Sequence, residues 1–289
     1  MQFWHATVFA EVDQLVEGAA MIEEFGFDGI SVSDHLVFPQ TVESKYPYTS
    51  DGRPWWSGEG EWPDPWVMVG AMAAVTNRVR FTTNVYVLPL RDVFTTAKSV
   101  GTAAVLSAGR VALGIGAGWM REEFDLVGQA YAGRGARMEE QVEILHKLWA
   151  GGMVEHHGAF HDFPPVQMSP TPPGPIPVWV GGTTDLALRR AASVGDGWIG
   201  VNTPMAELIH TAERLRIERD KAGKPQDTFE ILGAIDEPPT VENVRRLEDA
   251  GVTGLMASAW LFSKTDTTTV AGKREALERF AHRWLDPLR

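Results

Sequence analysis

Cysteine is absent from this chain of 289 residues, which excludes disulfide bonds, a thiolate nucleophile and any metal site with cysteine ligands. Long apolar runs are also absent, since no window approaches the ~20 residues that a membrane-spanning helix needs. The first residues, MQFWHATVFAEVDQ, contain no basic segment followed by a long apolar core, so no signal peptide is predicted. These absences favour a cytoplasmic protein.

Positive charge is scarce in the sequence. The chain has 26 Lys and Arg residues against 38 Asp and Glu residues, which gives a formal net charge of −12. Nucleic acids and anionic membrane surfaces would repel such a chain, so we expect neither of them as a partner.

Several catalytic and metal-binding signatures are missing as well. The sequence contains no G-x-S-x-G elbow and no Walker loop, which removes the commonest hydrolase and phosphoryl-transfer mechanisms. Neither Gly114 nor Gly116 begins the G-x-G-x-x-G fingerprint of a dinucleotide-binding fold. His156, His157 and His161 lie in a proline-rich stretch without a carboxylate or a helix at ligand spacing, and we predict no metal site there.

The chain does contain an alternation of strand-like and helix-like segments from end to end. This pattern is typical of βα units around a parallel sheet, and no change of composition marks a linker. We predict that residues 1–289 form a single α/β domain, a (β/α)8 TIM barrel, with a doubly wound open sheet as the alternative. The predicted strands are residues 3–8, 29–33, 79–88, 111–117, 177–180, 197–201, 229–235 and 254–260. Helices are expected between them, including one that opens with Thr203 as N-cap and Pro204 as its first residue.

Insertions interrupt the alternation after strands 2 and 4. Residues 38–66 combine five prolines with Trp55, Trp56, Trp62 and Trp66, and residues 151–175 are also rich in proline. Long insertions in a compact fold are usually functional lids or disordered segments. Because tryptophan is so frequent in the first insertion, we expect ordered caps.

The carboxyl ends of the strands form the active-site face of a barrel, and the residues that follow each strand are therefore the candidates for function. Strand two ends in Asp34-His35, an acid/base pair whose histidine can exchange a proton near neutral pH. A capped loop is the alternative reading of that dipeptide. Strand six ends in Val201-Asn202.

Glycines accumulate at two of the strand ends. Gly114, Gly116 and Gly118 leave bare backbone against which a flat ligand can lie, although tight packing or a turn would also require them. Gly181-Gly182 runs straight into a helix, whose free N–H groups predict an anion site suited to phosphate, with a plain turn as the alternative.

Five segments, in this order, resemble the bacterial luciferase-like superfamily of flavin and deazaflavin oxidoreductases. They are GFDGISVSDHLVFP (26–39), TNRVRFTTNVYVLPLRD (76–92), LSAGRVALGIGAGWMREEF (106–124), RGARMEEQVEILHKLW (134–149) and PVWVGGTTDLALRRAASVGDGWI (177–199). The resemblance covers about the first two-thirds of the chain. A further segment, SKYPYTSDGR (44–53), resembles the branch that uses the deazaflavin coenzyme F420.

The resemblance implies a barrel that holds the coenzyme ring in its mouth and the coenzyme phosphate near strands five and six. Asp34 and His35 match positions at the redox-active ring, and Asn84-Val85 matches a cis peptide that forms a bulge behind it. The other positions implied to contact the coenzyme are Gly116, Ala117, Gly118, Trp119, Gly181, Gly182, Thr183 and Val201. The resemblance also implies a homodimer.

One position departs from the resemblance. The sugar-phosphate dehydrogenases of this superfamily carry an acidic residue where Trp119 stands, and an indole cannot donate or accept the proton in its place. We therefore expect an apolar or aromatic substrate.

Our functional hypothesis is an F420-dependent oxidoreductase that transfers a hydride between the coenzyme and a small organic substrate. In this hypothesis His35 exchanges the proton, and Asp34 positions either His35 or the ring. Alternatives are an FMN-dependent monooxygenase that uses O2 and a separate flavin reductase, and a barrel that only binds or carries the coenzyme.

Two further groups of residues belong to the hypothesis. Trp55, Trp56 or Trp62 would wall the substrate cavity and exclude water, with a dimer interface or surface packing as the alternative. Lys45, Arg53, Arg134 and Arg137 are candidates to meet the carboxylates of the F420 tail.

Overall fold

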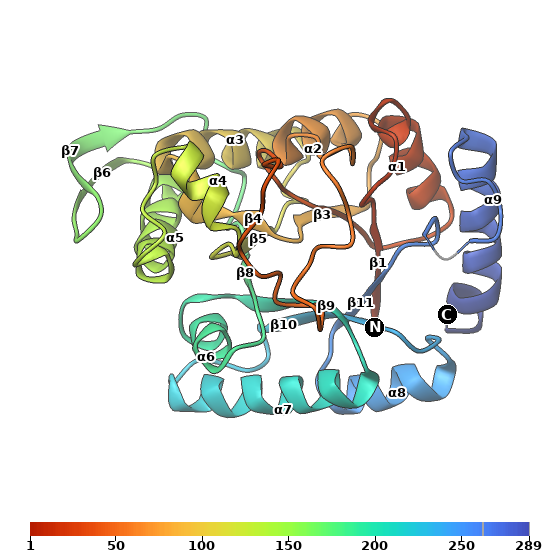
Figure 1. The fold of residues 1–289 in the computed structure, drawn as a ribbon. Coiled ribbons are helices and arrows are strands. Elements are labelled where there is room, and N and C mark those ends of the chain that lie inside the picture. The colour runs from red at the N-terminus through yellow and green to blue at the C-terminus, as the bar shows by residue number, and fades with distance from the viewer. Residues whose placement is uncertain (262, 289) are drawn as a thin grey trace.

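Parallel strands form the centre of this computed structural model, which describes residues 1–261 and 263–288 (Figure 1). The strands are β1 (Gln2–Ala6), β2 (Gly29–Val32), β3 (Arg80–Thr83), β4 (Tyr86–Val87), β5 (Leu113–Gly116), β8 (Val178–Gly181), β9 (Gly197–Thr203), β10 (Glu230–Ile235) and β11 (Gly254–Ala257). Their spatial order is β3-β2-β1-β11-β10-β9-β8-β5-β4. Each strand pairs in parallel with its neighbours in this order, as expected for short apolar strands that are buried on both faces.

The ring of strands closes through a broken strand. β3 and β4 are two parts of the predicted third strand, separated by a cis peptide bond between Asn84 and Val85. β3 pairs with β2, whereas β4 pairs with β5, so the two parts together join the two edges of the sheet. A parallel bridge between Phe81 and Val111 adds to this closure. The predicted (β/α)8 barrel and the implied cis peptide are confirmed.

Helices surround the barrel (Figure 1). They are α1 (Leu15–Glu24), α2 (Pro65–Ala73), α3 (Val93–Leu106), α4 (Arg121–Leu126), α5 (Arg134–Ala150), α6 (Asp185–Val194), α7 (Met205–Lys221), α8 (Val241–Asp249) and α9 (Val270–Phe280), with short turns at Val12–Gln14, Leu88–Leu90, Ala281–Leu285 and Asp286–Leu288. Side chains at the N-cap accept a backbone N–H in α2, α3, α6, α8 and α9, which explains where these helices begin. No helix within the described residues is long and apolar enough to cross a membrane.

The predicted start of α7 is wrong by one residue. Thr203 is the last residue of β9, where it pairs with Ile235, so its side chain does not cap the helix. Pro204 takes the N-cap position instead, and the carboxylate of Glu237 accepts the N–H of Met205 at 2.8 Å. The sheet therefore extends further than the sequence pattern predicted.

The second insertion is ordered, but it does not lie over the strand ends. It contains an antiparallel hairpin of β6 (Met153–His157) and β7 (Asp162–Gln167), which stands beside α5 in Figure 1. The ring of Phe163 packs 4.9 Å from that of Phe94 in α3, and Glu140 in α5 accepts N–H groups from the hairpin tip. This segment covers the outside of the barrel.

The inside of the barrel is filled by apolar side chains that close its amino-terminal end. The interior cluster consists of Trp4, Ala112, Trp179, Ile199, Leu232, Ala234 and Met256. The guanidinium of Arg80 lies 5.5 Å and 5.3 Å from the rings of Trp4 and Trp179, and it bonds to Glu230 at 3.0 Å. A ligand can therefore reach the interior of the barrel from the carboxyl ends of the strands and not from their amino ends.

His5 in β1 is fully buried on the outer side of the strand. Its Nε2 accepts the N–H of Ala259 at 3.1 Å, and its ring lies 4.4 Å from that of Trp260. Burial lowers the pKa of His5 from 6.5 to about 3, because the imidazolium would lose its hydration inside the folded protein.

We predict that His5 makes the folded protein less stable as the pH falls. Between pH 6.5 and about 3 the unfolded chain binds a proton that the folded chain excludes. The folded protein therefore loses stability as the pH falls through this range, and it keeps the full contribution of His5 above the range. The expected loss between pH 7 and pH 5 is about 2 kcal/mol. Urea unfolding should show this slope in the wild type and a flatter one in His5→Gln, which keeps an acceptor for Ala259. Equal slopes would contradict the prediction.

Candidate functional site

The residues predicted to form the site follow strands that end on one side of the barrel. Asp34 and His35 come after β2, Trp119 comes after β5, and Gly182 and Thr183 come after β8. Because the strands are parallel, these segments meet at the carboxyl end of the barrel, where enzymes of this architecture carry their active sites.

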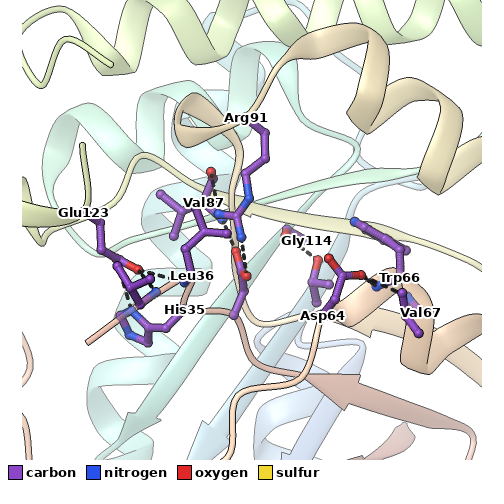
Figure 2. Close-up of polar contacts among 12 residues, drawn as sticks. His35, Leu36, Asp64, Trp66, Val67, Val87, Arg91, Gly114 and Glu123 are labelled. Carbon is purple, nitrogen blue, oxygen red and sulfur yellow. Dashed lines mark hydrogen bonds and ion pairs between the residues drawn. The ribbon is translucent and has the colours of Figure 1, made fainter. Parts of the chain in front are cut away.

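Asp34 is held by Arg91 and not by the neighbouring histidine. Its Oδ1 accepts a hydrogen bond from the Arg91 guanidinium at 2.6 Å, and its Oδ2 accepts the N–H of Val87 at 3.0 Å (Figure 2). Burial raises the pKa of the Asp34 carboxyl, while Arg91 and the Val87 N–H act in the opposite direction. Both oxygens of Asp34 thus have hydrogen-bond partners other than His35, and the hypothesis that Asp34 positions either His35 or the coenzyme ring stays a prediction.

The carboxylate that contacts His35 comes from Glu123, 88 residues further along the chain in α4. Glu123 Oε2 lies 3.2 Å from Nδ1 of His35, and its other oxygen accepts the N–H of Leu36 at 2.9 Å (Figure 2). The Glu123 side chain is 2% exposed and that of His35 is 9% exposed. A buried carboxylate thus holds both the imidazole and the backbone that follows it.

Aromatic side chains pack around His35. We call Phe9, Tyr46, Trp55, Trp56, Trp62 and Trp119 the aromatic cluster. The ring of His35 lies 4.8 Å from Trp62, 5.7 Å from Trp56 and 6.1 Å from Trp119. Trp55 contacts Phe9 at 4.8 Å but is 62% exposed. Of the three tryptophans predicted to wall the site, Trp56 and Trp62 therefore contact His35, and Trp55 lies at the rim of the cluster.

The first insertion, which carries most of this cluster, is anchored to the first turn of α4. Glu122 Oε1 accepts the N–H groups of Glu43 and Ser44 at 2.6 and 2.9 Å. At its far end the insertion stops where Asp64 caps α2 by accepting the N–H groups of Trp66 and Val67 (Figure 2). The insertion is consequently an ordered cap over His35, as expected.

The glycines at the strand ends are required by the broken strand. A Cβ on Gly114 would lie 1.9 Å from the carbonyl oxygen of Thr83, and Cβ atoms on Gly116 and Gly181 would lie 2.5 and 2.9 Å from the side chain of Val85. Gly118 has a φ of +83°, a left-handed conformation that favours glycine. Packing alone thus accounts for these glycines, and a coenzyme ring beside Gly116, Ala117 and Gly118 stays a prediction.

Asn84 lies near Val201 because its side chain contacts the preceding residue of β9, Gly200. The side-chain amide of Asn84 donates to the carbonyl oxygen of Gly200 at 3.3 Å. The register of β9 against β10 shifts between Leu232 and Ala234, so Gly200 and Val201 form a bulge there. The break in the third strand and the bulge in the sixth thus face one another across the barrel.

The predicted anion site lies at the start of α6. Gly182 has a φ of +110°, and Thr184, one residue after Thr183, caps the helix by accepting the N–H of Ala187 at 3.2 Å. The preceding N–H groups of the first turn, on Asp185 and Leu186, have no partner inside the helix. They are the donors that a phosphate would use, although the Asp185 carboxylate, paired with Arg214, adds negative charge nearby.

Two of the four basic residues proposed for the coenzyme tail are already engaged. Arg137 is buried and donates to the carbonyl oxygens of Pro89 and Ala130. Arg134 donates to the carbonyl oxygen of Gly118 and lies 3.7 Å from the ring of Tyr131. Lys45 and Arg53 are exposed on the first insertion and stay candidates.

A cavity lies at the opposite end of the barrel from His35. An apolar cavity of about 600 Å³ lies at the amino-terminal side of the barrel, lined by Trp149, Ile176 and Asp196 among others, and far along the strands from His35. In the part of the chain that the structure describes, no group of three or more His, Asp and Glu side chains could hold a metal ion.

Sequence reasoning missed Glu123, Arg91, Glu122 and Phe9. Phe9 follows the first strand, so the strand-end rule would have found it if applied there. The three charged residues carry no local signal, because each acts on a segment far away in the sequence.

We predict that Arg91 stabilises the fold mainly by neutralising Asp34. Removing one partner of a buried pair usually costs about 3–5 kcal/mol, because the other charge is left uncompensated. Arg91→Leu should lose stability of this order in urea unfolding, whereas the double variant Asp34→Asn/Arg91→Leu should lose clearly less. If the double variant lost as much stability as Asp34→Asn and Arg91→Leu lose together, this explanation would be contradicted.

Comparison with known proteins agrees with this geometry. The family model described as luciferase-like monooxygenase matches residues 3–236. An uncharacterized protein of Mycobacterium tuberculosis is 36% identical over 97% of this chain and 98% of its own length. An F420-dependent glucose-6-phosphate dehydrogenase of Nakamurella multipartita is 28% identical over 82% of this chain and 66% of its own length.

Among solved structures, an F420-dependent secondary alcohol dehydrogenase in complex with an F420-acetone adduct has the same fold. It superposes with a TM-score of 0.78 at 16% sequence identity and covers 100% of this chain and 99% of its own. With a family match over most of its length, the chain belongs to the luciferase-like monooxygenase family.

Proposed function

We propose that this protein is an F420-dependent oxidoreductase that transfers a hydride between the coenzyme and a small, apolar or aromatic organic substrate. The observation that carries the proposal is His35, a buried imidazole at the strand ends that is held by Glu123 and enclosed by Trp56, Trp62 and Trp119. The names of an F420-dependent relative and an F420-dependent structural neighbour support the choice of coenzyme.

The residues of the mouth fit such a coenzyme in their chemistry. Ala6 and Val85 are apolar, partly buried and packed on the interior cluster, so they suit the face of a planar ring. The N-terminus of α6 would hold the phosphate, and the exposed Lys45 and Arg53 would meet the carboxylates of the tail. When bound, F420 supplies the site of hydride transfer at its ring carbon.

The protein's own residues would position the substrate and move the proton. When an alcohol is oxidised, its carbon loses a hydride and His35 takes the proton from its oxygen; in the reverse direction His35 returns this proton. The indoles of Trp56 and Trp62 keep water away from the reacting atoms. Asp34, through Val87, holds the broken third strand in place beneath them.

The substrate preference follows from Trp119. Its indole ring lies 5.2 Å from Tyr46 and 6.5 Å from Trp56, so this wall is aromatic and Trp119 itself offers neither an acid nor a base. We therefore infer that the sugar phosphate named for the Nakamurella relative is not the substrate here. Ketones, enones, alcohols and terpenoids would suit an aromatic wall.

An FMN-dependent monooxygenase with a separate flavin reductase is the second candidate. The observation that favours it is the family model, which is itself described as luciferase-like monooxygenase. Such an enzyme would need O2 and reduced FMN, whereas a deazaflavin reacts poorly with oxygen.

Paired titrations should distinguish the two coenzymes. With Trp56, Trp62 and Trp119 around the site, binding should quench the intrinsic tryptophan fluorescence. We expect F420 to bind tightly and FMN negligibly. Tight binding of FMN, with product formed only in the presence of O2, would replace this proposal by the monooxygenase, and binding of neither coenzyme would refute both.

Replacing the imidazole should remove turnover but leave coenzyme binding. We expect His35→Ala to lower kcat about 100-fold to 10,000-fold, the usual contribution of a positioned acid or base. His210→Ala is the matched control, because His210 is an exposed histidine on α7. Full turnover of His35→Ala with coenzyme bound would show that another group moves the proton.

A further inference from the structure

We propose that Glu123 is a positioning residue that fixes the tautomer of His35, so that Nε2 is the nitrogen that exchanges a proton with the substrate. The reaction step in this inference rests on the proposed function. The contact between the two side chains does not, and it can be tested in the protein without coenzyme.

The geometry determines which ring nitrogen carries the hydrogen. Glu123 Oε2 lies 3.2 Å from Nδ1 of His35, and an ionised carboxylate can only accept hydrogen bonds. Nδ1 must therefore be the donor, which leaves the lone pair of the neutral ring on Nε2. No described residue forms a hydrogen bond with Nε2, so this nitrogen is the one available to a substrate.

Glu123 also holds the backbone that follows His35. Its Oε1 accepts the N–H of Leu36 at 2.9 Å and that of Val37 at 3.4 Å. Next to it in α4, Phe124 is fully buried and packs against Gly118, which fixes the helix to the end of β5. One carboxylate thus sets the orientation of the imidazole and the path of the chain directly after it.

His35 and Glu123 together account for the proton that the substrate loses in the proposed reaction. In alcohol oxidation the O–H bond of the substrate breaks and an Nε2–H bond forms, while the hydride goes to the coenzyme and the Nδ1–H bond to Glu123 is kept. The resulting imidazolium faces the negative charge of Glu123 in a buried place, where charges interact more strongly than in water.

The chain contains a similar arrangement far from the strand ends, in which Oε1 of Glu140 also lies 3.4 Å from Nε2 of His156. Glu140 Oε1 in α5 lies 3.2 Å from Nδ1 of His161, and it also accepts the N–H of His161 at 2.7 Å. Its Oε2 accepts the N–H of Ala159 at 2.9 Å in the tip of the outer hairpin. Glu140 and His161 therefore provide a matched control. Their side chains make the same contact as those of Glu123 and His35, but they lie away from the proposed site.

The test is ¹⁵N NMR of the histidine rings in the full chain, combined with turnover. In the wild type we expect His35 with its hydrogen on Nδ1; the signal is assigned by its loss in His35→Ala. In Glu123→Gln the side-chain oxygen can still accept Leu36 N–H, while the amide NH2 donates to Nδ1 and moves the ring hydrogen to Nε2. This variant should lose at least about 100-fold in kcat with unchanged coenzyme affinity.

Glu140→Gln should change the tautomer of His161 in the same way and leave turnover unchanged. The proposal is overturned if wild-type His35 carries its hydrogen on Nε2, if Glu123→Gln leaves the tautomer as it was, or if the tautomer changes without a loss of kcat. Should Glu123→Gln fail to fold, the wild-type spectrum decides the tautomer alone. A wild type that turns over no substrate would refute the proposed function, and the tautomer result would stand apart from it.

Discussion

The mouth of the barrel is organised around the break in its third strand. Because this strand changes partners between Thr83 and Tyr86, its neighbours must leave room for the residues that turn there. Thr83 donates its hydroxyl to the carbonyl oxygen of Gly114, and Val85 fills the space that side chains would occupy at Gly116 and Gly181. The positions of both glycine-rich strand ends depend on this one irregularity.

The break also explains why Asp34 is buried with Arg91. Once the strand has turned, the N–H of Val87 points toward the end of β2 and needs an acceptor, which Asp34 supplies at 3.0 Å. Because this carboxylate is buried, it then requires a positive partner. Arg91, one short turn beyond β4, supplies it and stacks 4.6 Å from the ring of Tyr86. The charge pair therefore serves the backbone of the barrel first.

Sequence patterns predicted the barrel and the location of its site because both follow from local regularities. Apolar runs marked the buried strands within one to three residues, and the strand-end rule placed His35 and Trp119 together. The partner of His35 could not be predicted in this way. Asp34 is adjacent in sequence, but successive residues of an extended chain point to opposite sides, and the true partner comes from α4.

The two glutamates at the start of α4 divide the first insertion into a fixed and a variable part. Glu123 ties down the residues directly after His35, and Glu122 ties down Glu43 and Ser44. The stretch between these anchors has a set length, whereas the next such anchor comes only at Glu61, whose carboxylate accepts the N–H of Val12 at 2.7 Å. Evolution or protein engineering could therefore exchange residues 45–60 as a cassette, with new length and shape, while the contact between His35 and Glu123 remained intact.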